Sequence, residues 1–260
     1  MTIAVERSGA VVRIVLNRPE ALNAWTPELG RALLGAVRDA AADPTVRAML
    51  VTGAGRAFSA GADVKVAREL TPAGEPDLST RLREIYNPIM LELRAAPKPV
   101  VAAVNGTCVG AGLGFVLACD FVVMAEGAVL GTAFTGIGLT CDSGLSVSLP
   151  EAVGMQRARA LLLRPTTFKA EQAVAWGMPF ELVPADQVRT AATELATGLA
   201  AGPTAAYAET KRLLVDGASR PFAESLEAEG TAQRRLGMTA DHGNAVRAFL
   251  AKQKPVFGGS

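Results

Sequence analysis

Residues 98–114 read KPVVAAVNGTCVGAGLG, a strand pattern that runs into a glycine-rich loop and then into an apolar helical run. Pro97 and Pro99 restrict the backbone ahead of Val100–Val104, whose apolar residues favour a strand. Glycines let a backbone approach a ligand closely, and the first amides of a helix have no partner within it. Such amides can stabilise an oxyanion. The loop lacks the Lys-Ser/Thr ending of a phosphate-binding Walker loop.

A second loop of this kind, residues 56–63, reads RAFSAGAD. It follows the strand pattern Ala48–Thr52 and the turn at residues 53–55. Taken alone, each loop is more often a tight connection between a strand and a helix, because glycine is common in such connections. Two such loops in this order are more informative than either one.

The first fifty residues predict a strand, a helix and a second strand. Val11–Leu16 is a β-branched run that ends in a turn at residues 17–19. Apolar residues recur at helical spacing over Pro27–Ala42, and Thr26 is a suitable N-cap ahead of a first-turn proline. With the strand at Ala48–Thr52, this order indicates an α/β fold with layered βαβ-type architecture.

The later segments predict an α/β core of roughly 200 residues followed by a helical tail. Prolines and a glycine within Leu70–Leu78 predict a mobile surface loop, followed by a helix from Ser79 to about Leu93. Phe121–Met124 is a further apolar strand. Helical spacing then dominates over Ala170–Trp176, Asp186–Leu199, Thr204–Leu214, Phe222–Leu236 and His242–Lys252.

Composition excludes several classes of function. The 260 residues are 50% apolar and 20% charged, and a net charge of +1 gives no general attraction to nucleic acid or to a membrane surface. The three cysteines lack metal-ligand spacing, and the single histidine, His242, makes Ser–His and Cys–His triads improbable. Neither a signal peptide nor a run of membrane-spanning length is present, so we expect a cytoplasmic protein.

Six segments in series carry a family resemblance, although several are weak when taken singly. They are Asn17-Arg18-Pro19 with Ala21-Leu22-Asn23-Ala24, Ala57–Asp63, Lys98–Gly106, Cys119-Asp120, Ala170–Gly177 and Phe249–Phe257. On these residues the chain resembles the enoyl-CoA hydratase/isomerase (crotonase) superfamily over nearly its whole length.

The resemblance implies a fold and an assembly. The fold is a ClpP-like spiral of ββα units, which would take residues 1–200 and hold the acyl-CoA site. A helical region at residues 201–260 would mediate trimerisation, and the chain would assemble as a homotrimer or a dimer of trimers. Coenzyme A would be part of the substrate, so no separate cofactor and no metal is expected.

The resemblance also implies which residues hold the substrate. The amides of Ala62 and Ala111 would grip the thioester carbonyl, where one well-aimed donor can contribute about 3 kcal/mol in the transition state. Tight packing is the plainer interpretation of these alanines. Coenzyme A would contact Ala21, Ala24, Ala60, Asp63, Val64 and Lys65, and Lys252 would reach the phosphates bound by a neighbouring subunit.

Three of these coenzyme A contacts have ordinary alternatives. Lys65 and Lys252 are equally well explained as solvated surface lysines. Asp63 is equally well explained as a turn residue, because aspartate is common in turns.

The hydratases of this superfamily use two glutamates, and both positions differ here. They align with Gly114, three residues beyond the second oxyanion amide, and with Phe134. Neither side chain can transfer a proton. Asp142 aligns with the aspartate that acts as the base in the dienoyl-CoA isomerases and in the epoxyphenylacetyl-CoA isomerase branch. Its local sequence is equally typical of a helix N-cap.

The sequence therefore predicts an enoyl-CoA isomerase of fatty acid metabolism that shifts a double bond by proton transfer at Asp142. Flanking apolar residues would raise the pKa of that carboxyl group by desolvation. Two alternatives stay open. One is an enoyl-CoA hydratase, a lyase, with an atypical acid and base. The other is a noncatalytic acyl-CoA-binding protein, which would keep both loops and lack both glutamates.

Overall fold

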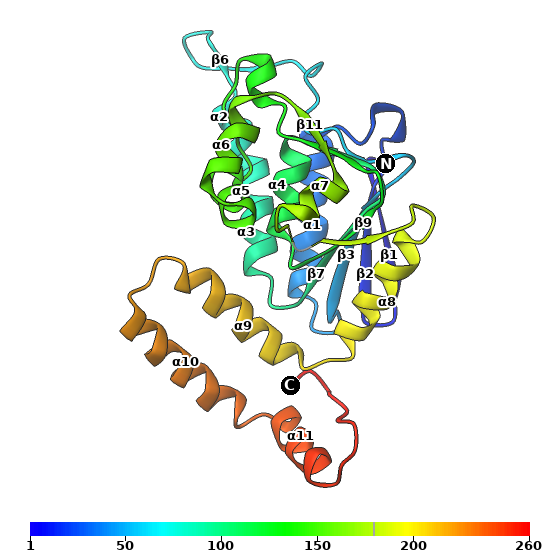
Figure 1. Cartoon of the computed structure of the whole chain (residues 1–260), viewed down its shortest axis with the longest axis vertical. Helices are drawn as coiled ribbons and strands as arrows, with labels where there is room; N and C mark the ends of the chain where they lie inside the picture. Colours follow the sequence, from blue (N-terminus) through cyan, green and yellow to red (C-terminus); the bar gives the residue numbers. More distant parts are fainter. Residues whose placement is uncertain (179) are drawn as a thin grey trace.

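Two β-sheets divide the strands of the chain between them. The computed structural model describes residues 1–178 and 180–260 (Figure 1). The larger sheet has the strand order β1-β2-β3-β7-β9-β12, and the smaller has the order β11-β10-β8-β4. The larger consists of β1 (Ile3–Ser8), β2 (Val11–Leu16), β3 (Ala48–Gly53), β7 (Val100–Val104), β9 (Phe121–Ala125) and β12 (Phe180–Val183). The smaller consists of β4 (Ala57–Ser59), β8 (Thr107–Val109), β10 (Val129–Gly131) and β11 (Thr167–Lys169).

The chain alternates between the two sheets in a repeating order. β3, β7 and β9 are parallel neighbours in the larger sheet, and each is followed by a strand of the smaller sheet: β4, β8 and β10. Each such pair leads into helical structure. The result is a coil of strand, strand and helix whose loops after β4 and β8 fall next to each other. These are the two glycine-rich loops.

The predicted βαβ unit at the start of the chain is confirmed. α1 (Pro27–Ala42) joins β2 to β3, which pair in parallel from Val11 with Ala48 to Leu16 with Gly53. The Thr26 hydroxyl accepts a hydrogen bond from Leu29 N at 3.2 Å, so the predicted N-cap is also confirmed. Buried apolar residues on one face of α1 contact β1, β2 and α3 (Asn87–Ala95).

Helices pack against the sheets and carry the rest of the core. α8 (Val188–Ala200) contacts β3, β7 and β9, and Ala192, Ala196 and Ala200 are buried. The core has four further helices, α4 (Ala111–Ala118), α5 (Leu145–Val153), α6 (Met155–Leu163) and α7 (Ala170–Ala175). It also has the short 3-10 turns η1 (Pro19–Ala21) and η3 (Phe134–Ile137). α4 contacts α3 and α5, which places the helix after the second loop in the centre of the molecule.

The surface loop expected over Leu70–Leu78 is present as the turn of a short hairpin, with residues 72–75 exposed. β5 (Glu69–Leu70) and β6 (Pro76–Asp77) pair antiparallel at its base. Arg81, buried at the start of the next helix, holds Glu69 through both carboxylate oxygens and also donates to Ala67 O at 3.0 Å. The strand pairing was not predicted, because this ion pair is not visible in the proline and glycine pattern.

The helix expected from Ser79 is present but contains an irregular turn. It runs as α2 (Ser79–Arg81), a π-helical turn over Leu82–Tyr86, and α3. A π turn inserts one extra residue per turn and therefore rotates the residues that follow it, and such turns are frequent at functional sites. Here the turn ends on Tyr86, whose side chain is buried.

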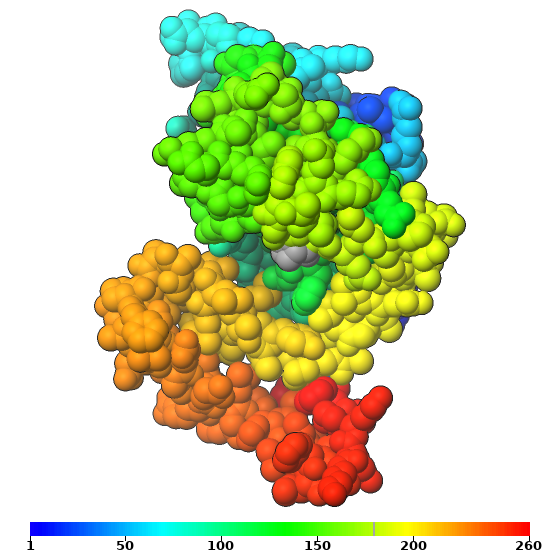
Figure 2. Space-filling model, viewed as in Figure 1, coloured from blue at the N-terminus to red at the C-terminus, as the bar shows by residue number. Residues whose placement is uncertain are grey.

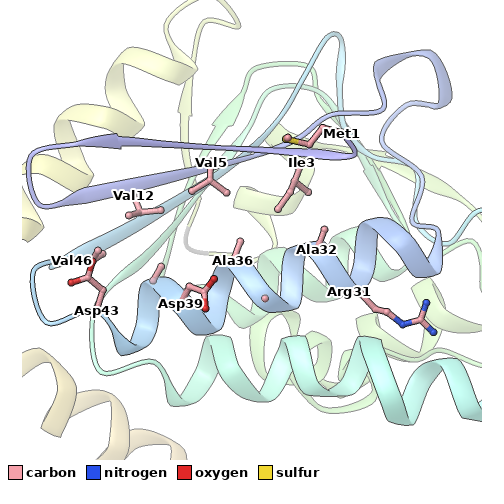
Figure 3. A pocket seen from close by; sticks show the side chains of 12 residues that line it. Met1, Ile3, Val5, Val12, Arg31, Ala32, Ala36, Asp39, Asp43 and Val46 are labelled. Carbon is pink, nitrogen blue, oxygen red and sulfur yellow. The ribbon is translucent and has the colours of Figure 1, made fainter.

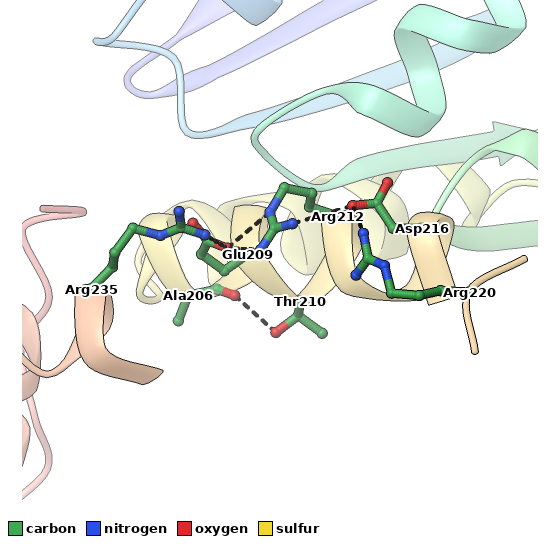
Figure 4. A network of polar contacts seen from close by, with 7 residues as sticks. All are labelled: Ala206, Glu209, Thr210, Arg212, Asp216, Arg220 and Arg235. Carbon is green, nitrogen blue, oxygen red and sulfur yellow. Dashed lines mark hydrogen bonds and ion pairs between the residues drawn. The ribbon is translucent and has the colours of Figure 1, made fainter. Parts of the chain in front are cut away.

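The chain ends in three helices that extend away from the core, drawn in orange to red in Figures 1 and 2. They are α9 (Thr204–Gly217), α10 (Phe222–Leu236) and α11 (Ala240–Leu250). Ala232 and Asp241 are their only buried residues in the part of the chain that the structure describes. Ion pairs link α9 to its neighbours through Glu209, Arg212, Asp216, Arg220 and Arg235 (Figure 4).

Polar contacts in two places tie the tail to the core. Lys211 of α9 pairs with Asp120 at 2.6 Å and donates to Leu93 O at 3.1 Å. Arg47 donates to Phe257 O at 3.1 Å and to Gly202 O at 2.5 Å, and the Asp241 carboxylate accepts from the amides of Gly258 and Gly259. Among the described residues, no helix is long and apolar enough to cross a membrane.

Candidate active site

The two glycine-rich loops touch each other through their backbones. A methyl group added to Gly61 would lie 3.0 Å from Val109 O and 3.5 Å from Ala111 N. Gly61 and Gly110 both have positive φ angles, +81° and +57°, a conformation that glycine adopts without steric cost. Because only glycine fits this close approach, the amides of Ala62 and Ala111 come to lie side by side.

Both amides are available to a ligand. Trp25 N–H donates to Gly61 O at 2.7 Å, and Asp63 N–H donates to Trp25 O at 2.9 Å. These two hydrogen bonds form a parallel β-bridge between Trp25 and Ala62. They use the carbonyl of Gly61 and the amide of Asp63, so the Ala62 N–H points away from Trp25. Ala111 is the first residue of α4, so its N–H has no partner within the helix. Neither amide has an acceptor within residues 1–178 and 180–260.

Tyr86 holds the first loop from behind. Its hydroxyl donates to Trp25 O at 3.1 Å, and its ring lies edge-on to the buried Trp25 ring with centroids 5.3 Å apart. Burial raises the pKa of Tyr86 to about 12, so the phenol stays protonated and remains a donor at any working pH. The negative charge of Asp142 adds to the rise in the pKa of Tyr86.

The segment before α1 packs against the first loop. The buried Asn23 amide donates to Ala54 O at 2.9 Å and to Ala57 O at 2.8 Å. Ala24 N–H bonds to Ala21 O, and Ala60 N–H bonds to Leu22 O. These bonds bring together three of the predicted coenzyme A contacts, namely Ala21, Ala24 and Ala60.

Asp63 has local partners. Its carboxylate pairs with Arg18 at 3.0 Å and accepts from Lys65 N at 3.1 Å. Burial raises the pKa of Asp63, but the Lys65 amide and the Arg18 guanidinium outweigh it and leave the pKa below its usual value. Val64 and Lys65 follow directly and are exposed beside the loop.

The chain does not bring Lys252 to these residues. Lys252 follows α11 in the exposed tail, at the far end of the molecule from the hairpin β5–β6 (Figure 1). His242 lies in the first turn of α11, as expected, and its N–H donates to Thr239 Oγ1 at 3.2 Å.

Gly114 and Phe134, which align with the hydratase glutamates, occupy filled space. A methyl group on Gly114 would lie 2.6 Å from both the Cβ atom and the carbonyl oxygen of Ser143. Atoms do not approach that closely without displacement, so backbone already fills the volume in which a glutamate at 114 would begin. Phe134 is buried, and its ring tip lies close to Gly110. Position 114 therefore leaves no room for an acidic side chain without rearrangement, and position 134 is taken by an aromatic ring.

Asp142 is the carboxylate next to this packed region. Its carbonyl accepts from Leu145 N at 3.1 Å, which closes a tight turn through Ser143 and Gly144. Both central residues have positive φ angles, +53° and +80°, as in a type I′ turn. The N-cap of α5 is Gly144 and not Asp142, so the alternative interpretation of Asp142 as an N-cap is wrong. The backbone turn comes between the aspartate and the helix.

The ionisation of Asp142 is shifted in the direction that suits a base. Burial raises the pKa of the half-buried carboxyl group, and a hydrogen bond of 2.7 Å from the Ser143 hydroxyl offsets this in part. A carboxyl group with a raised pKa is a stronger base when ionised, which suits proton transfer near neutral pH.

A surface groove lies elsewhere. It has a volume of about 580 Å³ and runs between α1 and the strands β1 and β2, lined by Ile3, Val12 and Asp39 among others (Figure 3). It contains none of the residues that form the two loops. No group of His, Cys, Asp and Glu side chains that could hold a metal ion occurs in the described ranges.

Sequence reasoning missed two residues of this site. Tyr86 was read only as part of a helix, because a π turn leaves no recognisable pattern in the residues. Ser143 was read only as an N-cap type of residue, although a serine directly before a glycine is a usable turn signal.

Comparison with known proteins gives a consistent result. The family described as enoyl-CoA hydratase/isomerase matches residues 6–260. The 1,2-epoxyphenylacetyl-CoA isomerase of Escherichia coli (strain K12) is 38% identical over 250 residues, covering 96% of this chain and 95% of that protein. The enoyl-CoA hydratase of Bacillus anthracis has a similar crystal structure, with a TM-score of 0.91, 28% identity and complete coverage of both chains.

Proposed function

The chain belongs to the enoyl-CoA hydratase/isomerase family and has its crotonase-type fold, and from that premise we propose that it is an enoyl-CoA isomerase whose base is Asp142. The observation that carries the choice is the contact between Gly114 and Ser143, since backbone fills the space that a water-activating glutamate would need. Of the carboxylates near the loops, Asp63 is paired with Arg18, which leaves Asp142 as the candidate base. An isomerase named in the comparisons, the 1,2-epoxyphenylacetyl-CoA isomerase, supports the same choice.

The proposed reaction needs one proton shuttle. Ionised Asp142 takes a proton from C2 of a 3-enoyl thioester, and the electron pair moves toward the thioester oxygen. The amides of Ala62 and Ala111 stabilise the resulting dienolate oxygen. Protonated Asp142 then returns a proton to C4, which gives the conjugated 2-enoyl thioester. Such a reaction would serve fatty acid metabolism in the cytoplasm.

The direct test uses a 3-enoyl-CoA in heavy water, followed by absorbance and mass spectrometry. The wild-type enzyme should form the conjugated product and incorporate deuterium. Asp142→Asn should bind the thioester with similar affinity and lose about 10²–10⁴-fold in kcat, the usual contribution of a general base. Full activity of Asp142→Asn would refute the proposal, and consumption of a 2-enoyl-CoA with uptake of water would establish a hydratase instead.

A second candidate is a noncatalytic acyl-CoA-binding protein. It is favoured by the same two positions, Gly114 and Phe134, which remove both hydratase glutamates while the binding loops stay intact. Acyl-CoA affinity without deuterium uptake from any enoyl thioester would support this candidate. The raised pKa of Asp142 argues against it, since a binder gains nothing from a desolvated carboxyl group.

We also propose residues 201–260 as the oligomerisation region of a homotrimer or a dimer of trimers. The support is the tail itself, where large apolar side chains such as Leu214, Phe222 and Phe249 are more than 70% exposed in the single chain. In such an assembly Lys252 would approach the coenzyme A of a neighbouring subunit. Light scattering should give the mass of three or six chains, and a monomer would exclude this role for the tail.

A further inference from the structure

We propose that Ser143 is the positioning residue of Asp142, and that Gly114 is the residue that makes room for it. The inference rests on the proposed function, because it concerns the base of that reaction. It goes further by assigning roles to two side-chain positions that have no acid–base chemistry of their own. Three independent features of the structure carry it.

The first feature is the hydrogen bond. Ser143 Oγ donates to Asp142 Oδ1 at 2.7 Å, a distance typical of a hydroxyl bonded to a carboxylate. Since a hydroxyl can donate only one proton, this bond fixes which oxygen of Asp142 is occupied. The other oxygen is left for the substrate. The bond therefore selects an orientation of the carboxylate and does more than fill space.

The second feature is the backbone of Ser143. Its φ angle of +53° lies in the left-handed region, which serine adopts rarely and at a cost. Glycine would fit this position without strain, as it does at the next residue, Gly144. Strain of this kind persists where the surrounding structure enforces it, and it is concentrated at functional sites. The serine side chain is thus retained at a position where glycine would be more stable.

The third feature is the notch at Gly114. Ser143 is only 3% exposed, and its Cβ atom and carbonyl oxygen lie against the bare Cα of Gly114 on α4. The first residue of the same helix is Ala111, one of the two oxyanion amides. A rigid helix therefore fixes the distance between the oxyanion site and the turn that carries Asp142. Any side chain at 114 would push the turn away from that helix.

Among the described residues, the Ser143 hydroxyl is the hydrogen-bond partner of the Asp142 carboxylate. The Tyr86 phenol on the π turn interacts electrostatically with Asp142, and the Arg81–Glu69 ion pair interacts electrostatically with the phenol. The pKa of the phenol is raised to about 12, so it is neutral at any working pH, and the ion pair carries no net charge. Removal of the Ser143 hydroxyl is therefore the single change expected to alter the acid limb of the pH profile.

The experiment measures kcat, KM and the pH profile of kcat/KM for 3-enoyl-CoA isomerisation in four proteins. These are the wild type, Ser143→Ala, Ser143→Gly and Ser148→Ala. Glycine adopts the left-handed backbone of residue 143 without strain, so Ser143→Gly still removes the hydroxyl from a folded protein if Ser143→Ala folds poorly. Ser148→Ala is the matched control, because its buried hydroxyl donates to Gly144 O on the same turn at 3.1 Å and does not touch Asp142.

Both Ser143 variants should lose about tenfold in kcat with KM changed less than twofold. Their acid limb should move up by about one pH unit, since the lost bond stabilises the ionised carboxylate. Ser148→Ala should keep the wild-type profile. An unchanged profile in both Ser143 variants, or the same change in Ser148→Ala, would overturn the inference. Asp142→Asn, measured alongside, separates the two proposals, because activity in that variant would refute the proposed function itself.

Discussion

Substitution of Gly114 by alanine adds one methyl group at the most crowded contact of the site. The new carbon would lie 2.6 Å from two atoms of Ser143, one of which belongs to the backbone and cannot rotate away. To reach ordinary contact, Ser143 and the turn that carries Asp142 must move by roughly 0.8 Å. A displacement of that size costs about 1–3 kcal/mol of folding free energy in a packed core.

The chain offers a matched control in Gly198, which lies in α8 and has nothing within 4 Å of an added methyl group. Glycine to alanine within a helix gains about 1 kcal/mol from the lower backbone entropy of the unfolded chain. Gly198→Ala should show that gain alone. In Gly114→Ala the same stabilisation is offset by the free-energy cost of the clash with Ser143. This variant should therefore unfold at a temperature a few degrees lower than Gly198→Ala.

Activity should separate the two variants more clearly than stability does. A base misplaced by about 1 Å costs on the order of 10²-fold in rate, so Gly114→Ala should lose most of its kcat while Gly198→Ala keeps it. Thermal unfolding and 3-enoyl-CoA isomerisation measure both effects on the same samples. Wild-type activity together with the stability of Gly198→Ala would show that the turn yields freely, and would refute the steric reasoning.

Three further perturbations have expected outcomes. Tyr86→Phe should lower kcat about tenfold and leave KM nearly unchanged, because Trp25 loses the hydroxyl that steadies the first oxyanion loop; steady-state kinetics with equal kcat would contradict this. Asp142→Asn should be more stable than the wild type at pH 7. Burial raises the pKa of the Asp142 carboxyl group, so the folded wild type binds this proton more tightly than the unfolded chain does. The stability of the wild type therefore falls as the pH rises from 3.8 through the raised pKa. Thermal unfolding from pH 3 to 8 tests this, and a constant difference between the two proteins would exclude it. Arg81→Lys should open the hairpin β5–β6 to proteases, because lysine cannot hold both oxygens of Glu69; equal cleavage rates would show that the hairpin is held by other contacts.

Local sequence was sufficient for the elements that are defined by their own residues. Helix Pro27–Ala42 and strand Val100–Val104 have the predicted bounds, because capping and periodicity are local properties. The α/β class followed from the order of such elements. The spiral and the pairing of the two loops came from the family resemblance, since the contacts between strands distant in sequence leave no periodic signal.

The sequence predicted individual residues of the candidate site, but not the contacts between residues that are distant in the chain. Gly114 was recognised as the absence of an acid, but its role as a notch depends on Ser143, which lies 29 residues away and packs against it only in the folded chain. The alternative interpretation of Asp142 as an N-cap was wrong for a related reason. Aspartate and serine are good caps, but the strained backbone of the turn moved the start of α5 beyond both of them.

The proposed grip on the carbonyl belongs to the main chain, and this has a consequence for how the protein can change over generations. Every amino acid except proline carries an amide hydrogen, so replacement of the side chain at Ala62 or Ala111 leaves both donors in existence. The proposed proton transfer, in contrast, depends on which residues stand at positions 114, 134 and 142. Substitutions at these three positions can therefore change the proposed proton chemistry, while both amide donors stay in the main chain.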